Sequence, residues 1–293
     1  CRLLHGRGGT VAGLETINAD WFAPVVWLVV YAPQDEAWWT AARVGAQALC
    51  ALPHVEAVLV QRRDLQPAAV VALSGELPPD VRALRDGLTY QLALGQGQNT
   101  GLFLDMTPGH AWLRAGAAGA SVLNLFAYTC AFSIAAVAGG ARRVVNLDMS
   151  KRALAIGRRN HLLNAPSCDA REPDGRAGAD VRYLPHDVFK SWSKLRKLGP
   201  YDRIVVDPPS YQFTSFVADR DYPKLLRRLA SLAAPGCQVL LCLNDPVRTP
   251  DTLLAAVAEH APGFEFTERL ATAPDHPDAD PARSLKMLVV SRR

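Results

Sequence analysis

The sequence predicts an α/β fold in which helices cover a mostly parallel sheet. One stretch is central to this prediction. VLNLFAYTCAFS, which begins at Val122, has the pattern of a buried strand, a tight turn and the start of a helix of small residues. A second strand follows and ends on Asp148, just before another helix. This order is typical of a nucleotide-type βαβ unit, so we expect a Rossmann-like core.

Later elements extend the same sheet. Strand patterns at 181–184, 203–207 and 238–243 are separated by helical or loop segments, as in parallel βαβ architectures. Two further strands, at 264–270 and 284–290, have no helix between them, which predicts a hairpin. We therefore expect a seven-stranded, mostly parallel sheet with an antiparallel last strand.

A small α/β region precedes this sheet. Strands are expected at 25–31, 55–61 and 69–73, and apolar residues with helical spacing predict a helix at 35–52. The glycine-rich, basic stretch Cys1–Gly13 is expected to be an extended arm or loop. It either contacts an RNA backbone or is a solvated lead-in.

Length and composition allow one large or two smaller domains. The chain has 293 residues, of which 49% are apolar, enough to bury a sizeable core. We place the boundary after residue 95: residues 1–95 form a small substrate-facing domain and residues 96–293 the cofactor-binding domain. The net charge of +4 permits an anionic partner without requiring one.

Cysteine usage and hydropathy indicate the compartment. The six cysteines show no CxxC pair and no zinc spacing, so no metal site is predicted and a reducing cytoplasm is expected. A membrane-spanning helix takes about 20 consecutive apolar residues, and no stretch of the chain has that length; the N-terminus also lacks the layout of a signal peptide. We expect a cytoplasmic protein that does not enter a membrane.

The turn at 124–130 indicates the cofactor. Its sequence, NLFAYTC, has no glycine, whereas a dinucleotide site needs glycines to bring the backbone close to a pyrophosphate. A turn this crowded suits a cofactor with a ribose and a cation but no phosphate, and S-adenosylmethionine is such a molecule. We expect Asp148 to hold the ribose diol, and Asn124, Tyr128 and Thr129 to contact the amino-acid end or the sulfonium. The alternative is a core unit that binds nothing.

A stiff rim follows the strand at 203–207. In Asp207-Pro208-Pro209-Ser210-Tyr211, two prolines fix two φ angles, and the first of them makes Asp207 extended. Ligands of open α/β sheets bind at this end of a parallel strand. The candidate catalytic residues are Asp207, Pro208 and Tyr211. Asp207 and a backbone carbonyl accept hydrogen bonds from a planar nitrogen, and Tyr211 stacks on the base. Otherwise the segment is a rigid loop without chemistry.

Four blocks occur together in one order: GQNTGLFLD, NLFAYTCAFS, VNLDMSK and DPPS. Their order and spacing resemble those of the S-adenosylmethionine-dependent methyltransferases that modify bases of large-subunit ribosomal RNA, over residues 90–290. The resemblance implies a class I methyltransferase fold, S-adenosylmethionine as cofactor and ribosomal RNA as partner. Relatives often carry a separate N-terminal RNA-binding domain, and we expect none in this chain.

The resemblance also implies further cofactor contacts. The stretch 97–105 is expected to be a glycine-punctuated turn that runs into a short apolar strand ending on Asp105. The part that carries Thr100, Phe103 and Asp105 corresponds to one that borders the methionine end of the cofactor. Phe126 and Ser150 lie within the cofactor motifs. Asp187, after the third strand, corresponds to the acid that accepts a hydrogen bond from the adenine amino group, although it also suits an N-cap of the segment 188–198. Asp207 belongs to the cofactor site as well as to the acceptor site.

The choice of acceptor atom is narrowed because the nucleophile needed for methylation of carbon 5 is missing. Methylating carbon 5 of cytosine needs a thiolate, and relatives that do so carry a Ser-Cys-Ser block after the fifth strand. Here Asn244-Asp245-Pro246 follows that strand, and Cys242 lies inside it. A nitrogen acceptor needs only orientation and exclusion of water, so we expect methylation of a ring or exocyclic nitrogen, on a purine.

Two other functions stay open at this point. A methyltransferase acting on a protein or small-molecule acceptor has the same cofactor chemistry and explains the modest charge. A noncatalytic RNA-binding or cofactor-sensing module has the same fold. A nicotinamide enzyme is disfavoured because the phosphate-binding glycines are missing.

Overall fold

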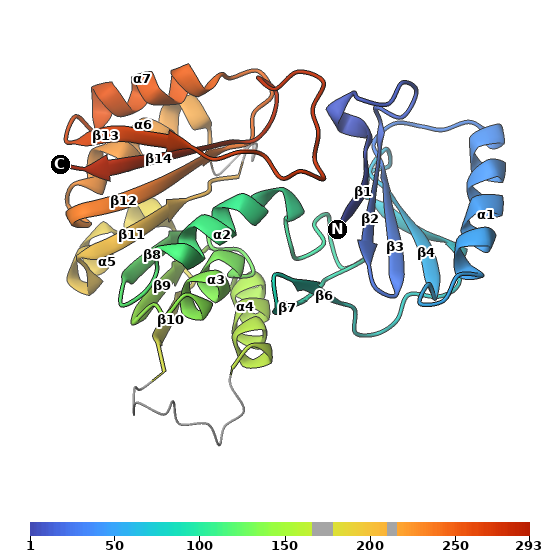
Figure 1. The fold of residues 1–293 in the computed structure, drawn as a ribbon, viewed down its shortest axis with the longest axis horizontal. Helices are drawn as coiled ribbons and strands as arrows, with labels where there is room; N and C mark the ends of the chain where they lie inside the picture. The colour runs from blue at the N-terminus through green and yellow to red at the C-terminus, as the bar shows by residue number, and fades with distance from the viewer. Residues whose placement is uncertain (166–177, 210–215) are drawn as a thin grey trace. The chain divides into compact units, whose positions relative to one another are not determined.

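A computed structural model describes residues 1–165, 178–209 and 216–293 (Figure 1). The chain forms two compact units. The N-terminal unit contains Cys1–Asp105 and Ala273–Pro281, and the C-terminal unit contains Met106–Thr272 and Ala282–Arg293. Chain contacts thus divide at residue 105. The boundary of the functional domains after residue 95 stays a prediction.

The N-terminal unit is built on a five-stranded sheet in the order β1-β2-β3-β4-β5. Only β3 and β4 are parallel, because α1 connects them; the other neighbours are antiparallel. The bounds are Arg2–His5 (β1), Ile17–Phe22 (β2), Val25–Val30 (β3), Glu36–Cys50 (α1), Ala57–Arg62 (β4) and Ala69–Ser74 (β5). A separate hairpin pairs β6 (Arg82–Arg85) with β7 (Leu88–Gln91). The three strands and the helix expected in this region are confirmed.

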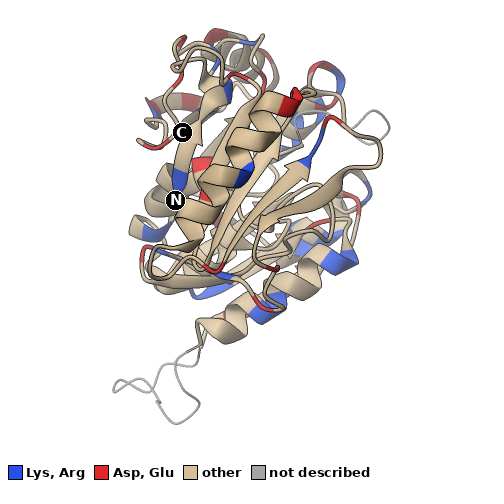
Figure 2. Ribbon diagram, turned by 90° about the vertical axis from the view of Figure 1, so that its right-hand side faces the viewer, with Lys and Arg blue, Asp and Glu red and all other residues tan. Residues whose placement is uncertain are grey.

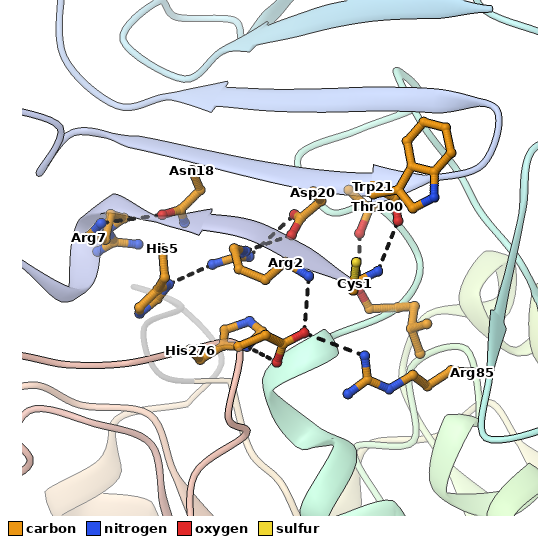
Figure 3. A network of polar contacts seen from close by, with 12 residues as sticks. Cys1, Arg2, His5, Arg7, Asn18, Asp20, Trp21, Arg85, Thr100 and His276 are labelled. Atoms are coloured by element: carbon orange, nitrogen blue, oxygen red, sulfur yellow. Dashed lines mark hydrogen bonds and ion pairs between the residues drawn. The ribbon is translucent and has the colours of Figure 1, made fainter. Parts of the chain in front are cut away.

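Polar and charged side chains tie the loop Ala273–Pro281 to β1 within the N-terminal unit (Figure 3). Arg2 donates to Asp20 at 2.6 Å, and its backbone N–H donates to Asp275 at 3.1 Å. The ring of His276 bonds to Asp275 at 2.9 Å. Burial raises the pKa of Asp275, but the N–H of Arg2 and the His276 ring outweigh it and bring that pKa to about 2. We call Arg2, Asp20, Asp275 and His276 the ionic network.

Of the arm or loop expected at residues 1–13, the extended arm is wrong for residues 2–8, whereas residues 9–13 form an exposed loop. Arg2–His5 forms β1, and Gly6–Gly8 forms a 3-10 turn. At Gly8 an added Cβ would lie 2.0 Å from the carbonyl oxygen of Pro277. The glycine therefore permits a close backbone approach, and the stretch packs against the unit instead of extending from it.

The C-terminal unit holds a seven-stranded sheet in the order β10-β9-β8-β11-β12-β14-β13 (Figure 1). β14 is antiparallel to both of its neighbours, whereas β8 to β12 are parallel to one another. The bounds are Ser121–Leu125 (β8), Arg143–Leu147 (β9), Asp180–Leu184 (β10), Tyr201–Val206 (β11), Ala233–Leu243 (β12), Phe264–Arg269 (β13) and Lys286–Arg292 (β14). The predicted mostly parallel sheet and its antiparallel last strand are confirmed.

Helices and two apolar cores cover the two faces of this sheet. Leu123, Val145 and Val206 pack on one face with residues of α5, α6 and α7. Val122 and Val144 pack on the other face with residues of α2 and α3. The helices are Thr107–Ala115 (α2), Ala131–Ala138 (α3), Lys151–Leu163 (α4), Trp192–Leu198 (α5), Ala218–Leu229 (α6) and Pro250–His260 (α7). Alternating strand residues thus supply both cores, which explains why the central strands are mostly apolar, with Asn124 and Asn146 as buried polar exceptions.

Two local predictions differ from the structure. The turn at 97–105 was expected to run into a short apolar strand, but Leu104–Met106 forms a 3-10 helix instead. The helix α6 had no predicted counterpart, because Pro223 lies inside it and its first turns are highly charged. Its apolar residues, among them Leu225 and Leu229, are buried against the sheet. Tertiary packing stabilises α6 despite the proline.

Surface charge and hydropathy add two observations. α4 exposes Lys151, Arg152, Arg158 and Arg159 and contains no acidic residue, as the blue segments of this helix show (Figure 2). Within the described residues, no helix combines the length and the hydropathy needed to cross a membrane.

Candidate cofactor and acceptor site

The acidic candidates lie at one edge of the C-terminal sheet. Asp148 directly follows β9, Asp187 follows β10 by three residues, and Asp207 directly follows β11. These strands are parallel, and β8 lies between β9 and β11. Their carboxyl ends therefore meet at the edge where ligands of such sheets bind.

The turn 124–130, which we call the cofactor loop, has an unusual backbone. Phe126, Tyr128 and Cys130 all adopt left-handed conformations, with φ of 58°, 46° and 65°. A residue other than glycine costs about 1–3 kcal/mol in this conformation, which persists only where the surrounding structure holds it in place. The loop therefore adopts, without glycine, backbone conformations that favour glycine, and it leaves the side chains of Phe126 and Tyr128 half-buried.

Asp148 is one of the groups that hold this loop. Its Oδ2 accepts from the backbone N–H of Tyr128 at 2.8 Å, and its Oδ1 accepts from the N–H of Ser150 at 2.7 Å. The carboxylate is half-buried, and each oxygen keeps a further acceptor position. Ser150 caps α4 by accepting from the N–H of Ala153 at 3.1 Å. Its side chain therefore has a structural role beside the predicted cofactor contact.

A line of uncharged polar side chains runs beneath the cofactor loop. Asn124 donates to Asn146 at 2.9 Å, Asn146 donates to Ser133 Oγ at 2.9 Å, and Ser133 lies 2.9 Å from the ring of His161. Burial lowers the pKa of His161 to about 4, so the ring is neutral at pH 7. We call these four residues the amide network. The sequence reasoning found Asn124 but missed the other three.

Asn124 Oδ1 is a buried acceptor with no hydrogen-bond partner in the described part of the chain. Asn124 itself is 1% exposed. A buried carbonyl oxygen left without a donor costs about 1–3 kcal/mol, and a bound ammonium group would satisfy it. S-adenosylmethionine carries such a group at its amino-acid end. The residues present are therefore chemically compatible with the predicted cofactor, while the assignment of Asp148 to the ribose and of Asn124 to the amino-acid end stays a prediction.

Asp187 and a group of aromatic rings lie next along the sheet edge. Asp187 accepts from the N–H of Phe189 at 2.8 Å and caps a 3-10 turn at Val188–Lys190, so the N-cap interpretation holds for the start of the segment 188–198, whereas α5 begins separately after Ser191. The ring of Phe216 packs 5.5 Å from that of Phe126 and stacks 6.5 Å from that of Phe189. These rings form an apolar wall suited to a planar ligand. Only Phe126 had been singled out from the sequence.

The acceptor side is formed after β11 and β12. Asp207 is half-buried and Pro208 is buried, whereas Tyr211 lies outside the described residues. Tyr222 donates its hydroxyl to the carbonyl of Cys242 at 3.0 Å, and burial raises its pKa well above the ordinary value. Tyr222 is thus a neutral donor that holds the end of β12.

Lys286 is a further residue at this edge that the sequence reasoning missed. It is fully buried, pairs in register with Leu243, and donates to the carbonyl of Asp245 at 2.6 Å. The loop after β12 is therefore held by a buried lysine side chain. The signal available in the sequence was a lysine within an apolar strand pattern, LKMLVV.

Three predicted cofactor residues belong to the N-terminal unit. Thr100 donates its hydroxyl to the carbonyl of Leu102 at 3.1 Å, Phe103 is 42% exposed, and Asp105 lies in the 3-10 helix. Their role at the methionine end stays a prediction.

Comparisons with known proteins agree with this geometry. The profile of a family described as S-adenosylmethionine-dependent methyltransferase matches residues 1–291. The ribosomal RNA large subunit methyltransferase I of Cronobacter sakazakii is 29% identical over 288 residues, which are 94% of this chain and 69% of that protein. The protein of the same name from Klebsiella pneumoniae is 29% identical over 237 residues, 78% of this chain and 57% of that protein. The chain thus spans little more than half of the length of some curated relatives.

Solved structures show the same fold. A putative S-adenosylmethionine-dependent methyltransferase from Streptococcus mutans superposes with a TM-score of 0.82 at 25% identity, covering 99% of this chain and 74% of that one. The likeness spans the residues of both units.

Proposed function

Because this chain belongs to the family of S-adenosylmethionine-dependent methyltransferases, we propose that it methylates a ring or exocyclic nitrogen of a base in ribosomal RNA. The cofactor follows from the family. The RNA substrate is supported by the names of the curated relatives, and the exposed basic face of α4 is compatible with a polyanion. A ribosomal RNA substrate also implies that the protein works in the cytoplasm.

The observation that carries the proposal is the alignment of acceptor groups along one sheet edge. Asp148, fixed by two backbone N–H groups, is placed to hold a ribose diol. Asn124 offers its unpaired oxygen to the ammonium group, and Asp187 has lone pairs left for the adenine amino group. Thr129 and the ring of Tyr128 complete the proposed cofactor contacts, together with Phe126.

The cofactor supplies a methyl group on a positively charged sulfur. A nitrogen lone pair of the base forms the new bond to the methyl carbon while the sulfur–carbon bond breaks, and the nitrogen then loses a proton to an acceptor or to water. Asp207 and a carbonyl of the rim at Pro208 are proposed to accept N–H bonds from the base and to orient its lone pair. Such positioning is enough for a nitrogen acceptor.

The described cysteines of the C-terminal unit favour nitrogen over carbon 5. Cys130, Cys237 and Cys242 are all buried. Burial, and then the charge of Asp148, raises the pKa of the Cys130 thiol, which disfavours a thiolate. The edge after β12 presents Asn244-Asp245-Pro246 where a thiol nucleophile would be needed.

The test is methyl transfer from labelled S-adenosylmethionine to three acceptors assayed in parallel: ribosomal RNA, a protein extract and a small-molecule extract. We expect label in the RNA, and mass spectrometry of its nucleosides should find an N-methylated base. Asp207→Asn should reduce turnover far more than it reduces the affinity for the cofactor, because the acceptor contact is the more demanding of its two proposed roles. Label only in protein or small molecules, or on carbon 5 of cytosine, would contradict the proposal.

The cofactor site has its own test. Asp148→Ala removes the proposed ribose contacts and one anchor of the cofactor loop, so titration calorimetry should show the Kd for S-adenosylmethionine rising by about 100-fold or more. Asp148→Asn keeps the shape of the side chain, so it should raise the Kd less than Asp148→Ala does. Unchanged affinity in both variants would place the cofactor elsewhere.

A further inference from the structure

The cofactor loop has a second support that comes from α4. Asn160 is fully buried on this helix, and its Nδ2 donates to the backbone carbonyl of Thr129 at 3.0 Å. Thr129 lies between two left-handed residues, Tyr128 and Cys130. We propose that Asn160 is a positioning residue that holds the cofactor loop in its binding conformation and thereby sets the affinity for S-adenosylmethionine.

The loop is held on two sides. Asp148 binds the N–H of Tyr128, and Asn160 binds the carbonyl of the next residue, Thr129. Both partners of the Asn160 bond are buried, so losing it leaves the Thr129 carbonyl with one donor fewer in a dry environment. Three left-handed residues without glycine make other loop conformations competitive once a support is removed.

Helix α4 also touches the loop through a glycine. A Cβ added at Gly157 would lie 2.4 Å from Cys130 Sγ and 3.0 Å from Cys130 Cβ. No side chain fits there, so the helix backbone packs directly against the loop. Gly157 and Asn160 are three residues apart and lie on the same face of α4. In this proposal the face of α4 that carries Gly157 and Asn160 fixes the shape of the loop, and we call it the template.

The expected effect is on binding and not on the methyl-transfer step. If only a fraction of the molecules has the loop in its binding conformation, the apparent Kd rises by the reciprocal of that fraction. Once the cofactor is bound, the loop is in place and the acceptor side is unchanged. This inference rests on the proposal that residues 124–130 bind the cofactor.

The test compares Asn160→Ala with a matched control. Asn160→Ala should raise the Kd and the KM for S-adenosylmethionine about tenfold, with kcat at saturating cofactor within about twofold of the original. Tyr201→Phe removes another buried bond from a side chain to a carbonyl, also 3.0 Å long, at the opposite end of β11. It should lower stability and leave the Kd unchanged. A folded Asn160→Ala with unchanged Kd, or with reduced kcat and unchanged KM, would overturn the inference.

A second pair of variants tests the template without removing a hydrogen bond. Gly157→Ala pushes on Cys130 and should also weaken cofactor binding. Adding Cys130→Gly makes room for the new methyl group and suits the φ of 65° at that position, so the double variant should recover much of the affinity. No recovery would count against the template. If Asp148→Ala leaves affinity unchanged, the proposed cofactor site fails; if it abolishes binding while the α4 variants have no effect, only this inference fails.

Discussion

The two units are each held by a polar network, and the two networks are of opposite kinds. The ionic network of the N-terminal unit joins β1 to a loop more than 250 residues away through Arg2 and the carboxylates of Asp20 and Asp275. Arg2 and Asp275 are partly exposed, whereas Asp20 and the ring of His276 are buried. The amide network of the C-terminal unit joins neighbouring strands and helices through neutral groups. Asn124, Asn146 and Ser133 are each exposed by 1% or less.

The difference shows where charge is tolerable. A charge under the cofactor loop would be far from water and would pair poorly, which costs several kcal/mol, whereas neutral amides satisfy one another in place. The loop 273–281 has few apolar residues to bury, so it is held by charge-assisted bonds near the surface. The amide network thus supports the cofactor loop, and the ionic network attaches residues 273–281 to β1.

The largest loss of stability is expected when a charge is placed in the amide network. Asn146→Asp puts a carboxylate at a fully buried position where both hydrogen-bonded side chains, Asn124 and Ser133, are neutral and offer no counter-charge. We expect a loss of about 3 kcal/mol in the free energy of unfolding, measured by denaturant titration.

The reverse change is the control. Asp275→Asn removes a charge from the ionic network and keeps the shape, and it should cost only about 1 kcal/mol. If Asp275→Asn destabilised the protein more than Asn146→Asp does, the distinction between the two networks would be wrong.

Acid should weaken both networks through their histidines. Burial, followed by the charge of Arg2, lowers the pKa of His276 to about 4, and burial lowers that of His161 to about 4. The unfolded chain takes up these protons near pH 6.5 and the folded chain does not, so stability present above pH 6.5 is lost as the pH falls towards 4. Each ring should contribute a loss of about 2 kcal/mol between pH 7 and pH 5, seen in unfolding titrations at the two pH values.

His276→Gln and His161→Gln separate the two contributions. The free energy of unfolding of each variant should depend less on pH than that of the unaltered chain, and the difference should equal the contribution of one histidine ring. The ionic network should weaken further below pH 4, because the pKa of Asp275 is about 2 and its stabilisation is lost as the pH falls through that value. Equal slopes in all three proteins would show that neither ring is held neutral by the fold.

Salt should produce the smallest effect and act on one network only. Raising the ionic strength screens partly exposed charges, so the destabilisation caused by Asp275→Asn should shrink by less than about 1 kcal/mol. The destabilisation caused by Asn146→Ala should stay constant, because no charge is involved. A salt dependence of the same size in both variants would indicate a general effect on the unfolded chain.

Much of the candidate site was predictable because it follows single strands. Asp148, Asp187 and Asp207 come after strands that are recognisable from their apolar runs, and parallel strands bring their carboxyl ends to one edge. The C-terminal hairpin was predictable for a similar reason: two strand patterns stand without a helix between them. The cofactor itself followed from a turn without glycine.

What could not be predicted depends on contacts between distant segments. Asn160 is one polar residue among several on α4, and only the packing of this helix on the loop gives it a role. Lys286 is buried because its strand pairs with β12 and its Nζ reaches the backbone carbonyl of Asp245. The 3-10 helix at Leu104–Met106 replaced an expected strand, since an apolar run of that length suits either conformation.

The sequence by itself determined the α/β class, the succession of the central strands along the chain and the acidic residues at their ends, because periodicity and turn chemistry are local properties of the chain. The tertiary structure alone decided which polar groups meet: the amide network, the support from α4, and the attachment of residues 273–281 to the N-terminal unit. Hydrogen bonds and ion pairs act only over a few ångströms, so a residue's partner is known only when the fold has brought the two segments together.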